Sequence, residues 1–316
     1  MCTALWLQEG CFGRTLDLEY TYHETVTVTP RRYPFRFRCV PTLDRHYAII
    51  GMATVASGVP LYYDGMNERG LCMAGLNFPH SAVYATPAEQ GENVAVFEMI
   101  PYVLGQCATV REARQRLSRV RVCDIPFSAD YPTATLHWML ADREHCAVAE
   151  SSADGWRIYD DPVGVMTNEP SFPHQMSHLS EFARLSPAQP EGGWVSPISR
   201  GAGAVGLPGD FSSPSRFVRA AFARAHAKGA GEDRVNRFFH LMATVEIPKG
   251  CVRLPDGRDA VTQYTACMDQ SQGAYYYRTY ENPQINGALL RDEDLEGDSL
   301  TVIPLQKRFF VNWQKG

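Results

Sequence analysis

The chain begins with MCTALWL (residues 1–7) and, after a short turn, continues with GRTLD (residues 13–17). The apolar run from Cys2 to Leu7 predicts a buried strand that starts at the second residue. A hairpin of this length returns Arg14 and Asp17 to a position alongside Cys2. The start of the chain therefore brings a thiol, a guanidinium and a carboxylate together on one pair of strands.

Cys2 is the first candidate for a catalytic residue because of its position. Cysteine is small, so we expect the cell's aminopeptidase to remove Met1 and leave Cys2 with a thiol and a free α-amine. An α-amine has a reference pKa of about 7.7–8.0 and can act as a base near neutral pH. One residue then supplies both nucleophile and base, as in enzymes with an amino-terminal threonine. The alternative is a small hydrophobic residue in an edge strand.

Arg14 and Asp17 give Cys2 two charged neighbours. A guanidinium beside a thiol favours the thiolate, and a carboxylate near the α-amine can orient it by hydrogen bonding. The alternative is an ordinary surface ion pair, which contributes about 0–1 kcal/mol.

Arg216 is a third charged candidate. Ser213 and Pro214 predict the start of a helix, with serine as the N-cap and proline in the first turn. Arg216 follows in that first turn, where a cation opposes the helix dipole by about 0.3–1 kcal/mol. Local conflicts of this kind concentrate at functional sites, although a solvated arginine on the outer helix face is an equally good interpretation.

Asn77 and Asn168 both occur where an expected strand runs into a turn that contains proline. A side-chain amide can donate a hydrogen bond to a developing oxyanion. Asparagine is also common in turns for conformational reasons, so neither residue is informative alone.

Composition excludes several classes of protein. The 316 residues carry a formal net charge of −5, so nothing favours nucleic acid as a partner, and 45% of them are hydrophobic, as in globular proteins. The nine cysteines are scattered and show no C-x-x-C, which predicts reduced thiols in a cytoplasmic protein without zinc or disulfides. No stretch resembles a signal peptide or a membrane span.

Other catalytic motifs are missing from the sequence. His174 and His178 have i, i+4 spacing, but no H-E-x-x-H is present, and we expect an exposed pair and no metal site. The G-x-S-x-G motif and the signature of papain-like proteases are also absent.

Local patterns predict strands first, then helices, then strands again. This order indicates an α+β domain with layered antiparallel sheets and no linker that would divide it. The expected strands are 2–7, 25–29, 47–55, 71–76, 135–141, 146–150, 156–159, 260–268, 274–280 and 299–304. The expected helices are 93–107, 109–118, 213–228 (with Gly229 as C-cap) and 233–244. Residues 64–70 are expected to form turns, and residues 186–209 a long loop.

Motifs along almost the whole chain resemble the choloylglycine hydrolase family, which comprises bile salt hydrolases and penicillin V acylases. The motifs are MCT (1–3), FGRTLD (12–17), DGMNE (64–68), GLNFP (75–79), LHWM (136–139), TN (167–168), GLPGD (206–210), SPSRF (213–217) and QYT (263–265).

The resemblance implies an N-terminal-nucleophile (Ntn) hydrolase with an αββα four-layer sandwich over residues 2–316, and no cofactor. Cys2, freed of Met1, would attack an amide and form a thioester. The family's other catalytic residues correspond to Arg14 beside the thiolate, Asp17 at the α-amine, Asn77 and Asn168 in the oxyanion hole, and Arg216 nearby. The resemblance also suggests a homotetramer.

The position of Asn77 resembles the bile salt hydrolase branch, since penicillin V acylases often have tyrosine there. This branch acts on glycine- or taurine-conjugated bile acids. By position, the apolar walls of the substrate pocket are Leu16, Ala56, Tyr63, Phe127, Tyr131 and Leu136. Arg200, in the long loop, could pair with the anionic tail of the conjugate.

Three alternatives stay open from the sequence. The first is a penicillin V acylase. The second is an acyltransferase activity in addition to hydrolysis, because an amine could intercept the thioester. The third is a sterol-binding protein without catalysis.

Overall fold

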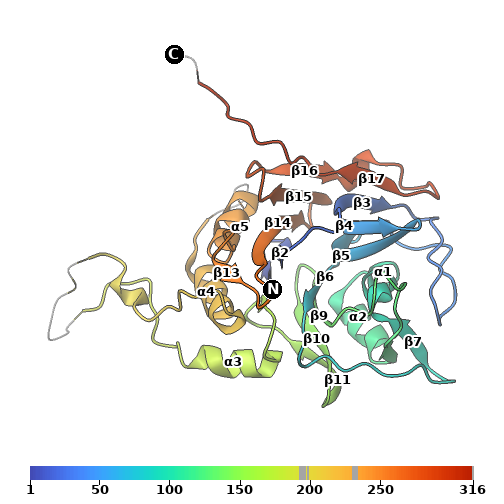
Figure 1. Ribbon diagram of the computed structural model, residues 1–316, viewed down its shortest axis with the longest axis horizontal. Coiled ribbons are helices and arrows are strands. Elements are labelled where there is room, and N and C mark those ends of the chain that lie inside the picture. The colour runs from blue at the N-terminus through green and yellow to red at the C-terminus, as the bar shows by residue number, and fades with distance from the viewer. Residues whose placement is uncertain (192–196, 198, 230–233, 315–316) are drawn as a thin grey trace.

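Two antiparallel β-sheets lie face to face between layers of helices in the computed structural model, which describes residues 1–191, 197, 199–229 and 234–314 (Figure 1). The first sheet carries the amino terminus on its second strand from one edge. Its strands, in spatial order, are β12 (Val165–Met166), β1 (Cys2–Leu7), β2 (Cys11–Leu18), β14 (Asp259–Asp269), β15 (Ala274–Thr279) and β16 (Asn286–Leu289), and β13 (Val252–Arg253) also pairs with β14.

The second sheet has eight strands. In spatial order they are β11 (Gly155–Asp160), β10 (Cys146–Ser152), β9 (Leu136–Ala141), β6 (Cys72–Asn77), β5 (Val59–Asn67), β4 (Ile49–Ala56), β3 (Thr25–Thr29) and β17 (Thr301–Pro304). A separate parallel pair consists of β7 (Glu92–Ala95) and β8 (Val120–Cys123).

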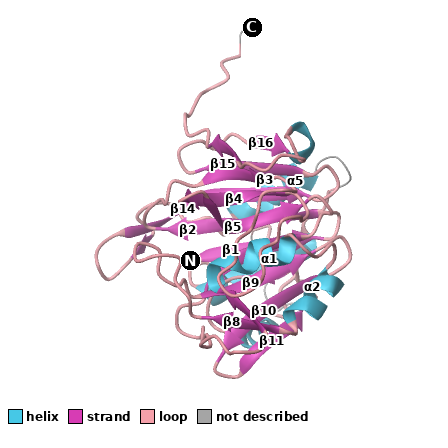
Figure 2. Cartoon of the chain, turned by 90° about the vertical axis from the view of Figure 1, so that its right-hand side faces the viewer, coloured by secondary structure: helices cyan, strands magenta, loops and turns pink. Residues whose placement is uncertain are grey.

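Helices cover the outer face of each sheet. Helices α4 (Ser213–His226) and α5 (Arg234–Ala243) pack on the first sheet, and their buried phenylalanines join its core. Helices α1 (Met99–Leu104) and α2 (Val110–Leu117) lie on the second sheet (Figure 2). Their buried residues share one hydrophobic core with Trp138 and Leu140. Helix α3 (Phe172–Ser180) lies beside α4. The αββα Ntn fold predicted from the resemblance is confirmed.

The β1–β2 hairpin forms as the sequence predicts. Cys2 pairs with Leu16 and Ala4 pairs with Arg14, so the guanidinium is brought next to the thiol. Gly13 allows β14 to approach β2 closely, because a Cβ atom at this position would lie 1.9 Å from the carbonyl oxygen of Ala266. Glycine in the FGRTLD motif is therefore required by strand packing.

Side chains of this hairpin alternate between two environments, as strand geometry dictates. Arg14 points toward the second sheet, where it donates to the carbonyl oxygens of Tyr63 and Gly75. Thr3 points to the opposite face, where its hydroxyl meets Arg216 of α4. Asp17 shares that face, since its carboxylate lies 3.9 Å from the same guanidinium. The thiol and the Asp17 carboxylate therefore lie on opposite faces of the sheet.

Most of the predicted elements are found with small shifts. The strands predicted over 2–7 and 25–29 have the predicted bounds. The helix predicted after Thr109 is α2, and the Thr109 hydroxyl caps its first turn by accepting from the amide of Glu112 at 3.2 Å. The long loop 186–209 contains one short 3₁₀ turn, Ala202–Ala204, among its described residues; residues 192–196 and 198 lie outside them.

Three local predictions are wrong. Residues 64–67 are the end of β5 and form no turn, because they pair with β4 and β6. The helix expected over 93–107 is limited to a 3₁₀ turn, η1 (Val96–Glu98), and α1, since residues 92–95 pair with β8 as a parallel strand. Helix α4 has Ser212 as its N-cap and ends at His226, so Gly229 is not its C-cap.

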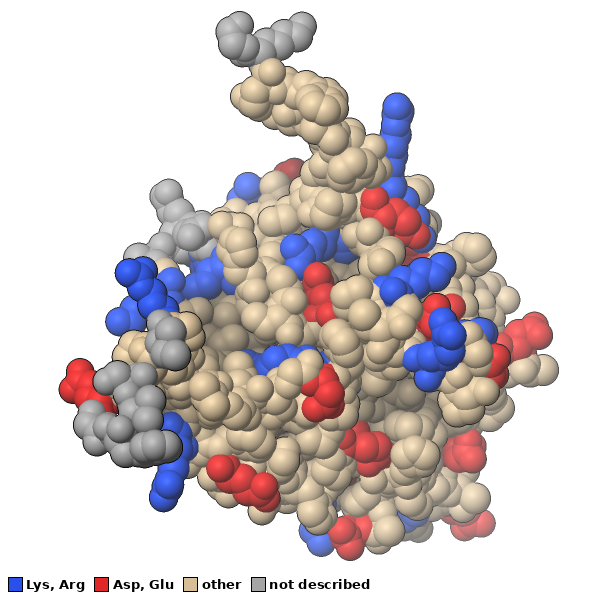
Figure 3. Space-filling model, turned by 60° about the vertical axis from the view of Figure 1, so that its left-hand side comes forward, with Lys and Arg blue, Asp and Glu red and all other residues tan. Residues whose placement is uncertain are grey.

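The described surface carries mixed charge. On the face drawn in Figure 3, basic and acidic side chains are interspersed over a mostly uncharged surface. Among the described residues, no helix is both long enough and apolar enough to cross a membrane.

Candidate active site

The thiol of Cys2 lies at the first residue of β1 and is only 2% exposed. Its Sγ accepts a hydrogen bond from Nη2 of Arg14 at 2.5 Å. The Cys2 main-chain nitrogen donates to Oδ1 of Asn168 at 2.7 Å, and its carbonyl oxygen accepts from Nη1 of Arg216 at 2.5 Å. We call Cys2, Arg14, Asn168 and Arg216 the polar cluster.

Arg14 is fully buried, and each of its guanidinium nitrogens has an acceptor. Nε donates to the carbonyl oxygen of Thr15 (2.9 Å), Nη1 to that of Gly75 (2.8 Å), and Nη2 to the thiol. Burial alone lowers the pKa of Arg14, but the neighbouring Cys2, Tyr264, Asp64 and Asp17 raise it, and the net shift is upward. Arg14 is therefore a fixed cation whose orientation is set by carbonyl oxygens of both sheets.

Arg216 reaches the same site from the first turn of α4. Its guanidinium donates to the Thr3 hydroxyl at 2.6 Å and to Oδ1 of Asn168 at 2.8 Å, in addition to the Cys2 carbonyl. Burial lowers the pKa of Arg216, and the charges of Asp17 and Cys2 oppose this shift. The position that conflicts with the helix dipole is thus occupied by a buried arginine bonded to the strand that carries Cys2.

Asn168 is positioned by the residues around it. Its amide nitrogen Nδ2 donates to the carbonyl oxygen of Asn77 at 2.7 Å, and its main-chain nitrogen donates to the Ser213 hydroxyl at 2.8 Å. Gln175 of α3 donates to the carbonyl oxygens of Asn168 and Glu169. Both ends of the Asn168 carboxamide are therefore engaged within the protein.

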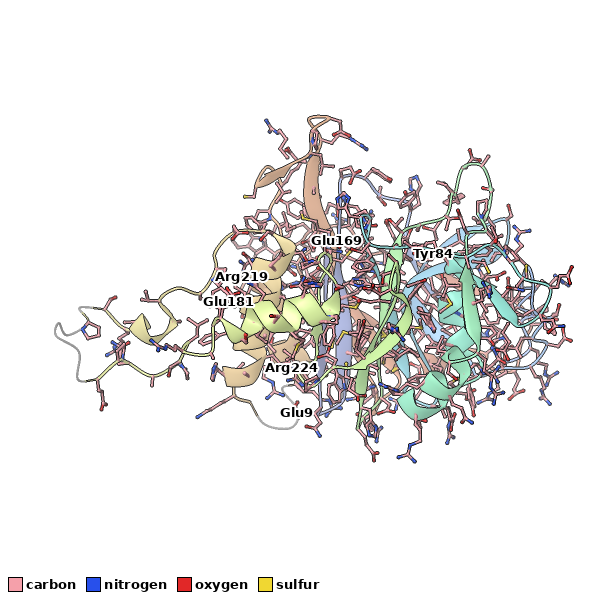
Figure 4. The ribbon with its side chains drawn as sticks, turned by 90° about the horizontal axis from the view of Figure 1, so that it is seen from below. Glu9, Tyr84, Glu169, Glu181, Arg219 and Arg224 are labelled. Carbon is pink, nitrogen blue, oxygen red and sulfur yellow. The ribbon has the colours of Figure 1, made fainter. Side chains whose placement is uncertain are left out.

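Glu169, labelled in Figure 4, extends this support to the 78–84 segment. Its carboxylate accepts from the main-chain nitrogens of His80 and Ser81, both at 2.9 Å, and from the Ser81 hydroxyl at 2.6 Å. The turn that carries Asn168 is thereby held to the segment that follows Asn77.

A cavity of about 410 Å³ opens directly in front of Cys2 and Arg14. Five of the seven predicted substrate-binding residues line it: Leu16, Tyr63, Phe127, Tyr131 and Leu136. The other two are not part of its lining: Ala56 lies at the end of β4, and Arg200 is exposed in the long loop.

One side of the cavity consists of aromatic residues from three separate segments. Phe97 contacts Phe127 edge to face at 5.3 Å between ring centroids, Phe127 contacts Tyr131 at 6.0 Å, and Tyr131 lies 6.3 Å from Tyr22. We call these four residues the aromatic wall. The site thus combines a nucleophile with an apolar chamber of drug-sized volume, as expected for a small-molecule enzyme.

Similarity to known proteins extends over nearly the whole chain. Residues 2–303 match the family described as linear amide C–N hydrolases, choloylglycine hydrolase family. The chain belongs to the choloylglycine hydrolase family. It is 44% identical over 315 residues to the bile salt hydrolase/transferase of Lactiplantibacillus plantarum, with 97% of each chain covered.

Solved structures agree with this membership. A mutant of the conjugated bile acid hydrolase from Clostridium perfringens is 34% identical, covers the full length of both chains and superposes with a TM-score of 0.94. The penicillin V acylase from Agrobacterium tumefaciens, at 21% identity, covers 96% of this chain and 91% of its own and shares the fold with a TM-score of 0.76. The protein is therefore an amide C–N hydrolase of this family.

Within this family site, Asp17 is placed differently from our expectation. Its carboxylate accepts from the hydroxyls of Thr262 (2.6 Å) and Thr15 (3.1 Å), and Cys2 nitrogen bonds to Asn168 instead. Only the main-chain carbonyl oxygen of Asp17 meets the amino terminus, where it accepts from Met1 nitrogen at 2.6 Å. Strand alternation, which directs the Asp17 side chain toward α4, explains the difference.

Asn77 and Asn168 also differ from each other. Asn168 was expected in the oxyanion hole, but its amide nitrogen is committed to the Asn77 carbonyl. Asn77 lines the cavity, and among the described residues its Nδ2 has no hydrogen-bond partner, whereas its Oδ1 accepts from Thr135. The free amide donor near the thiol is thus that of Asn77.

A buried trio behind Arg14 was not anticipated as part of the site. Asp64 of β5 accepts from the hydroxyls of Tyr264 and Tyr275, both at 2.6 Å, and all three are buried. Burial raises the pKa of Asp64, although Arg14 and the two hydroxyls act in the opposite direction. Asp64 and Tyr264 belong to the quoted motifs DGMNE and QYT, which was the signal available in the sequence.

All nine cysteines are free thiols. Burial raises the pKa of Cys72, Cys146 and Cys267 well above that of an ordinary thiol, and that of Cys107 to about 11. No cluster of three or more potential metal ligands occurs among the residues that the structure describes.

Proposed function

We propose that the protein is a bile salt hydrolase that cleaves the amide bond of glycine- or taurine-conjugated bile acids with Cys2 as nucleophile. The observation that carries the proposal is the Cys2 thiol, hydrogen-bonded to Arg14 at 2.5 Å, in the wall of an apolar cavity of about 410 Å³. Relatives named for bile salt or conjugated bile acid hydrolysis match this chain over nearly its full length.

The first half of the reaction uses the polar cluster. Removal of Met1 turns the Cys2 nitrogen, held by Asn168, into an α-amine that takes up the thiol proton. The sulfur bonds to the amide carbonyl carbon while Arg14 fixes the position of the thiolate. The free Nδ2 of Asn77 donates to the oxyanion. The C–N bond then breaks, and the amino acid leaves with the proton from the α-amine.

The second half of the reaction regenerates the thiol. A water molecule gives its proton to the α-amine and adds to the thioester carbon. The C–S bond breaks, free bile acid is released, and the proton returns to the sulfur. Arg216 holds the Cys2 carbonyl oxygen and Asn168 throughout, so the amine keeps its position in both halves.

The cavity fits a rigid steroid better than a short chain. Its walls combine aliphatic residues such as Leu16 and Leu136 with four aromatic rings. Burial of apolar surface contributes about 25 cal/mol per Å², so a steroid body contributes most of the binding free energy.

A transferase activity is the second candidate. The relatives from Lactiplantibacillus plantarum and Clostridium perfringens are both named bile salt hydrolase/transferase. A thioester reacts with an amine as it does with water, so an amino acid in excess would form a new bile acid amide. Incubation of free or conjugated bile acid with an excess of a second amino acid, followed by chromatography, tests this activity.

Replacement of Cys2 tests the main proposal. We expect Cys2→Ala and Cys2→Ser to lose almost all hydrolysis of glycocholate while the fold is retained. The matched control is Cys251→Ser, an exposed cysteine outside the site, which should keep full activity. Full activity of Cys2→Ala would contradict the proposal, as would a strong preference of the wild-type protein for penicillin V.

Intact-mass measurement tests the role of the α-amine. The purified, active protein should lack Met1. An active protein that retains Met1 would rule out the Cys2 amine as base. A homotetrameric assembly and a cytoplasmic location stay predictions, which analytical ultracentrifugation and cell fractionation can test.

A further inference from the structure

Residues 124–135, between β8 and β9, contribute Phe127 and Tyr131 to the aromatic wall. The tip of this segment closes on itself. The main-chain nitrogens of Phe127 and Ser128 both donate to the carbonyl oxygen of Tyr131, at 3.1 and 3.3 Å. The tip therefore holds its own shape, but these bonds do not attach it to the rest of the molecule.

Tyr84, labelled in Figure 4, anchors the end of the segment that precedes β9. Its hydroxyl accepts from the main-chain nitrogen of Leu136 at 2.6 Å and lies within hydrogen-bonding distance of the carbonyl oxygens of Ala134 and Leu136. This anchor fixes Leu136 next to Asn77 but makes no hydrogen bond to residues 127–131 at the tip.

Arg38 anchors the tip itself from the loop between β3 and β4. Its Nη2 donates to the carbonyl oxygen of Phe127 at 2.8 Å, and its guanidinium carbon lies 5.8 Å from the Phe127 ring centroid and 5.9 Å from that of Phe97. Among the described residues, this is the only hydrogen bond that joins residues 126–133 to the rest of the chain.

Arg38 is exposed, but its main chain is attached to a buried residue. Its main-chain nitrogen donates to Oε1 of Glu98 at 2.7 Å, and Glu98 is a buried residue that directly follows Phe97. Arg38 is thus fixed to the same turn that carries Phe97 and reaches across to Phe127. One side chain connects two of the three segments that form the aromatic wall.

Phe97 separates two cavities. It lines the cavity at Cys2, and it also lines a second cavity of about 350 Å³ formed by residues 33–37, 57–60 and their neighbours. The Arg38 guanidinium contacts two rings at once, that of Phe97, which lines both cavities, and that of Phe127, which lines the cavity at Cys2. Guanidinium groups are well suited to this task, because they stack on aromatic rings and donate hydrogen bonds in their own plane.

We propose that Arg38 is a specificity-determining positioning residue, which holds the aromatic wall in the shape that accepts a steroid acyl group. It touches no reacting atom and acts only through Phe97 and Phe127. The identity of the large acyl group rests on the proposed function, but the positioning of the wall does not.

The kinetic test compares Arg38→Ala and Arg38→Lys with the wild-type protein on a large and a small acyl group, glycocholate and penicillin V. For Arg38→Ala we expect KM for glycocholate to rise roughly tenfold, as the loss of two cation–π contacts and a hydrogen bond suggests. Its kcat, and both constants for penicillin V, should change less than about twofold. Arg38→Lys keeps a cation but loses the planar guanidinium. We expect its KM for glycocholate to lie between those of the wild-type protein and Arg38→Ala.

The matched control is Arg36→Ala, two residues away. Arg36 is exposed, and among the described residues it makes no hydrogen bond and stacks on no aromatic ring. Its removal should leave all four constants within about twofold of the wild-type values. An Arg38→Ala variant with unchanged KM for glycocholate, or with equal losses on both substrates, would overturn the proposal.

Hydrogen exchange supplies a readout that needs no substrate. Amide exchange over residues 126–133 should become faster in Arg38→Ala and stay unchanged in Arg36→Ala, while exchange in β1 and β2 is the same in all proteins. Unchanged exchange in the tip would refute the positioning role even if bile salts prove to be the substrate. Conversely, failure of the wild-type protein to cleave glycocholate would refute the proposed function but leave this result valid.

Discussion

The polar cluster and the aromatic wall face the same cavity, but they are held in opposite ways. The polar cluster is buried, comes from two adjacent strands, one turn and one helix, and has an acceptor for every guanidinium nitrogen of Arg14 and Arg216. The aromatic wall is half-buried, comes from three loops or turns, and its tip is joined to the body by Arg38. The residues that react thus lie mainly on strands and a helix, whereas the residues that shape the substrate pocket lie on the segments that connect such elements.

This difference predicts how mutations divide between the two regions. A change in the polar cluster moves or unpairs a buried group next to the thiol, so it should lower kcat. A change in the aromatic wall alters the fit of the acyl group and leaves the thiol in place, so it should raise KM.

Arg14→Lys should give the largest loss. An ammonium group has no planar fork with which to meet the Thr15 and Gly75 carbonyls and the thiol together, so buried acceptors are left without a partner. We expect kcat for glycocholate to fall by about 10²–10³, as when one preorganised hydrogen-bond donor is removed from an active site. Steady-state kinetics of the purified variant measure it.

The matched control is Arg157→Lys, an exposed arginine of β11. It should behave as the wild-type protein. If Arg14→Lys retained more than a tenth of the wild-type kcat, the fixed guanidinium would not be essential to the chemistry.

Asn168→Ala should give the next largest loss. The substitution removes the acceptor of the Cys2 nitrogen and the link to the Asn77 carbonyl, so the amine loses its orientation. A fall in kcat of about 10–10² is expected from lost positioning, with little change in KM. Single-turnover measurements, which separate thioester formation from its hydrolysis, should show both steps slowed, since the amine acts in each. Loss of only one step would contradict the shared role.

Three of the four members of the polar cluster carry a local physical signal in the sequence, and Asn168 was assigned by resemblance. Cys2, Arg14 and their contact follow from the length of one hairpin, and Arg216 follows from a helix start marked by Ser213-Pro214. These are local signals, in which register and capping leave few alternatives.

Orientation within the cluster was harder to predict. The face of β2 that carries Asp17 follows from strand alternation once Arg14 lies beside the thiol. Which end of the Asn168 carboxamide meets Cys2 depends on contacts with Arg216 and Asn77, which are distant in the sequence. The role of Asp64 beneath Arg14 depends in the same way on two tyrosines about 200 residues away.

The aromatic wall was predicted only in part. Phe127 and Tyr131 were assigned by resemblance, whereas Phe97 was expected inside a helix and Arg38 gave no signal. Three loops meet at this place, and the positions of loops are set by tertiary contacts rather than by local propensity.

Phe127→Leu tests the wall with a smaller expected effect. Leucine keeps an apolar side chain but removes the ring that Arg38, Phe97 and Tyr131 contact. We expect KM for glycocholate to rise by about 3- to 10-fold, because each aromatic or cation–π contact contributes about 0.5–1.5 kcal/mol. Turnover at saturation should be unchanged. A fall in kcat without a change in KM would mean that the wall positions the thiol as well as the substrate.

The smallest effect on turnover is expected at Asp161, which supports the turn before β12, remote from the reacting atoms. Its Oδ1 accepts from the main-chain nitrogens of Val163 and Gly164, and burial raises its pKa to about 6 despite these bonds. The folded protein thus binds a proton more tightly here than the unfolded chain, where the pKa is about 4. Protonation of Asp161 contributes up to about 3 kcal/mol to the free energy of unfolding. This contribution is fully present below about pH 4 and is lost as the pH rises through about 6.

Asp161→Asn removes this titration while its Oδ1 can still accept both bonds. The free energy of unfolding of both proteins is measured in urea at pH 4.5 and 7.5. The value for the variant minus that for the wild-type protein should be about 2 kcal/mol larger at pH 7.5 than at pH 4.5. Activity on glycocholate should stay within about twofold, because the variant changes neither the polar cluster nor the aromatic wall. A stability difference that is independent of pH would show that the Asp161 carboxylate is ionised in the folded protein at both values, and that its two amide donors outweigh its burial.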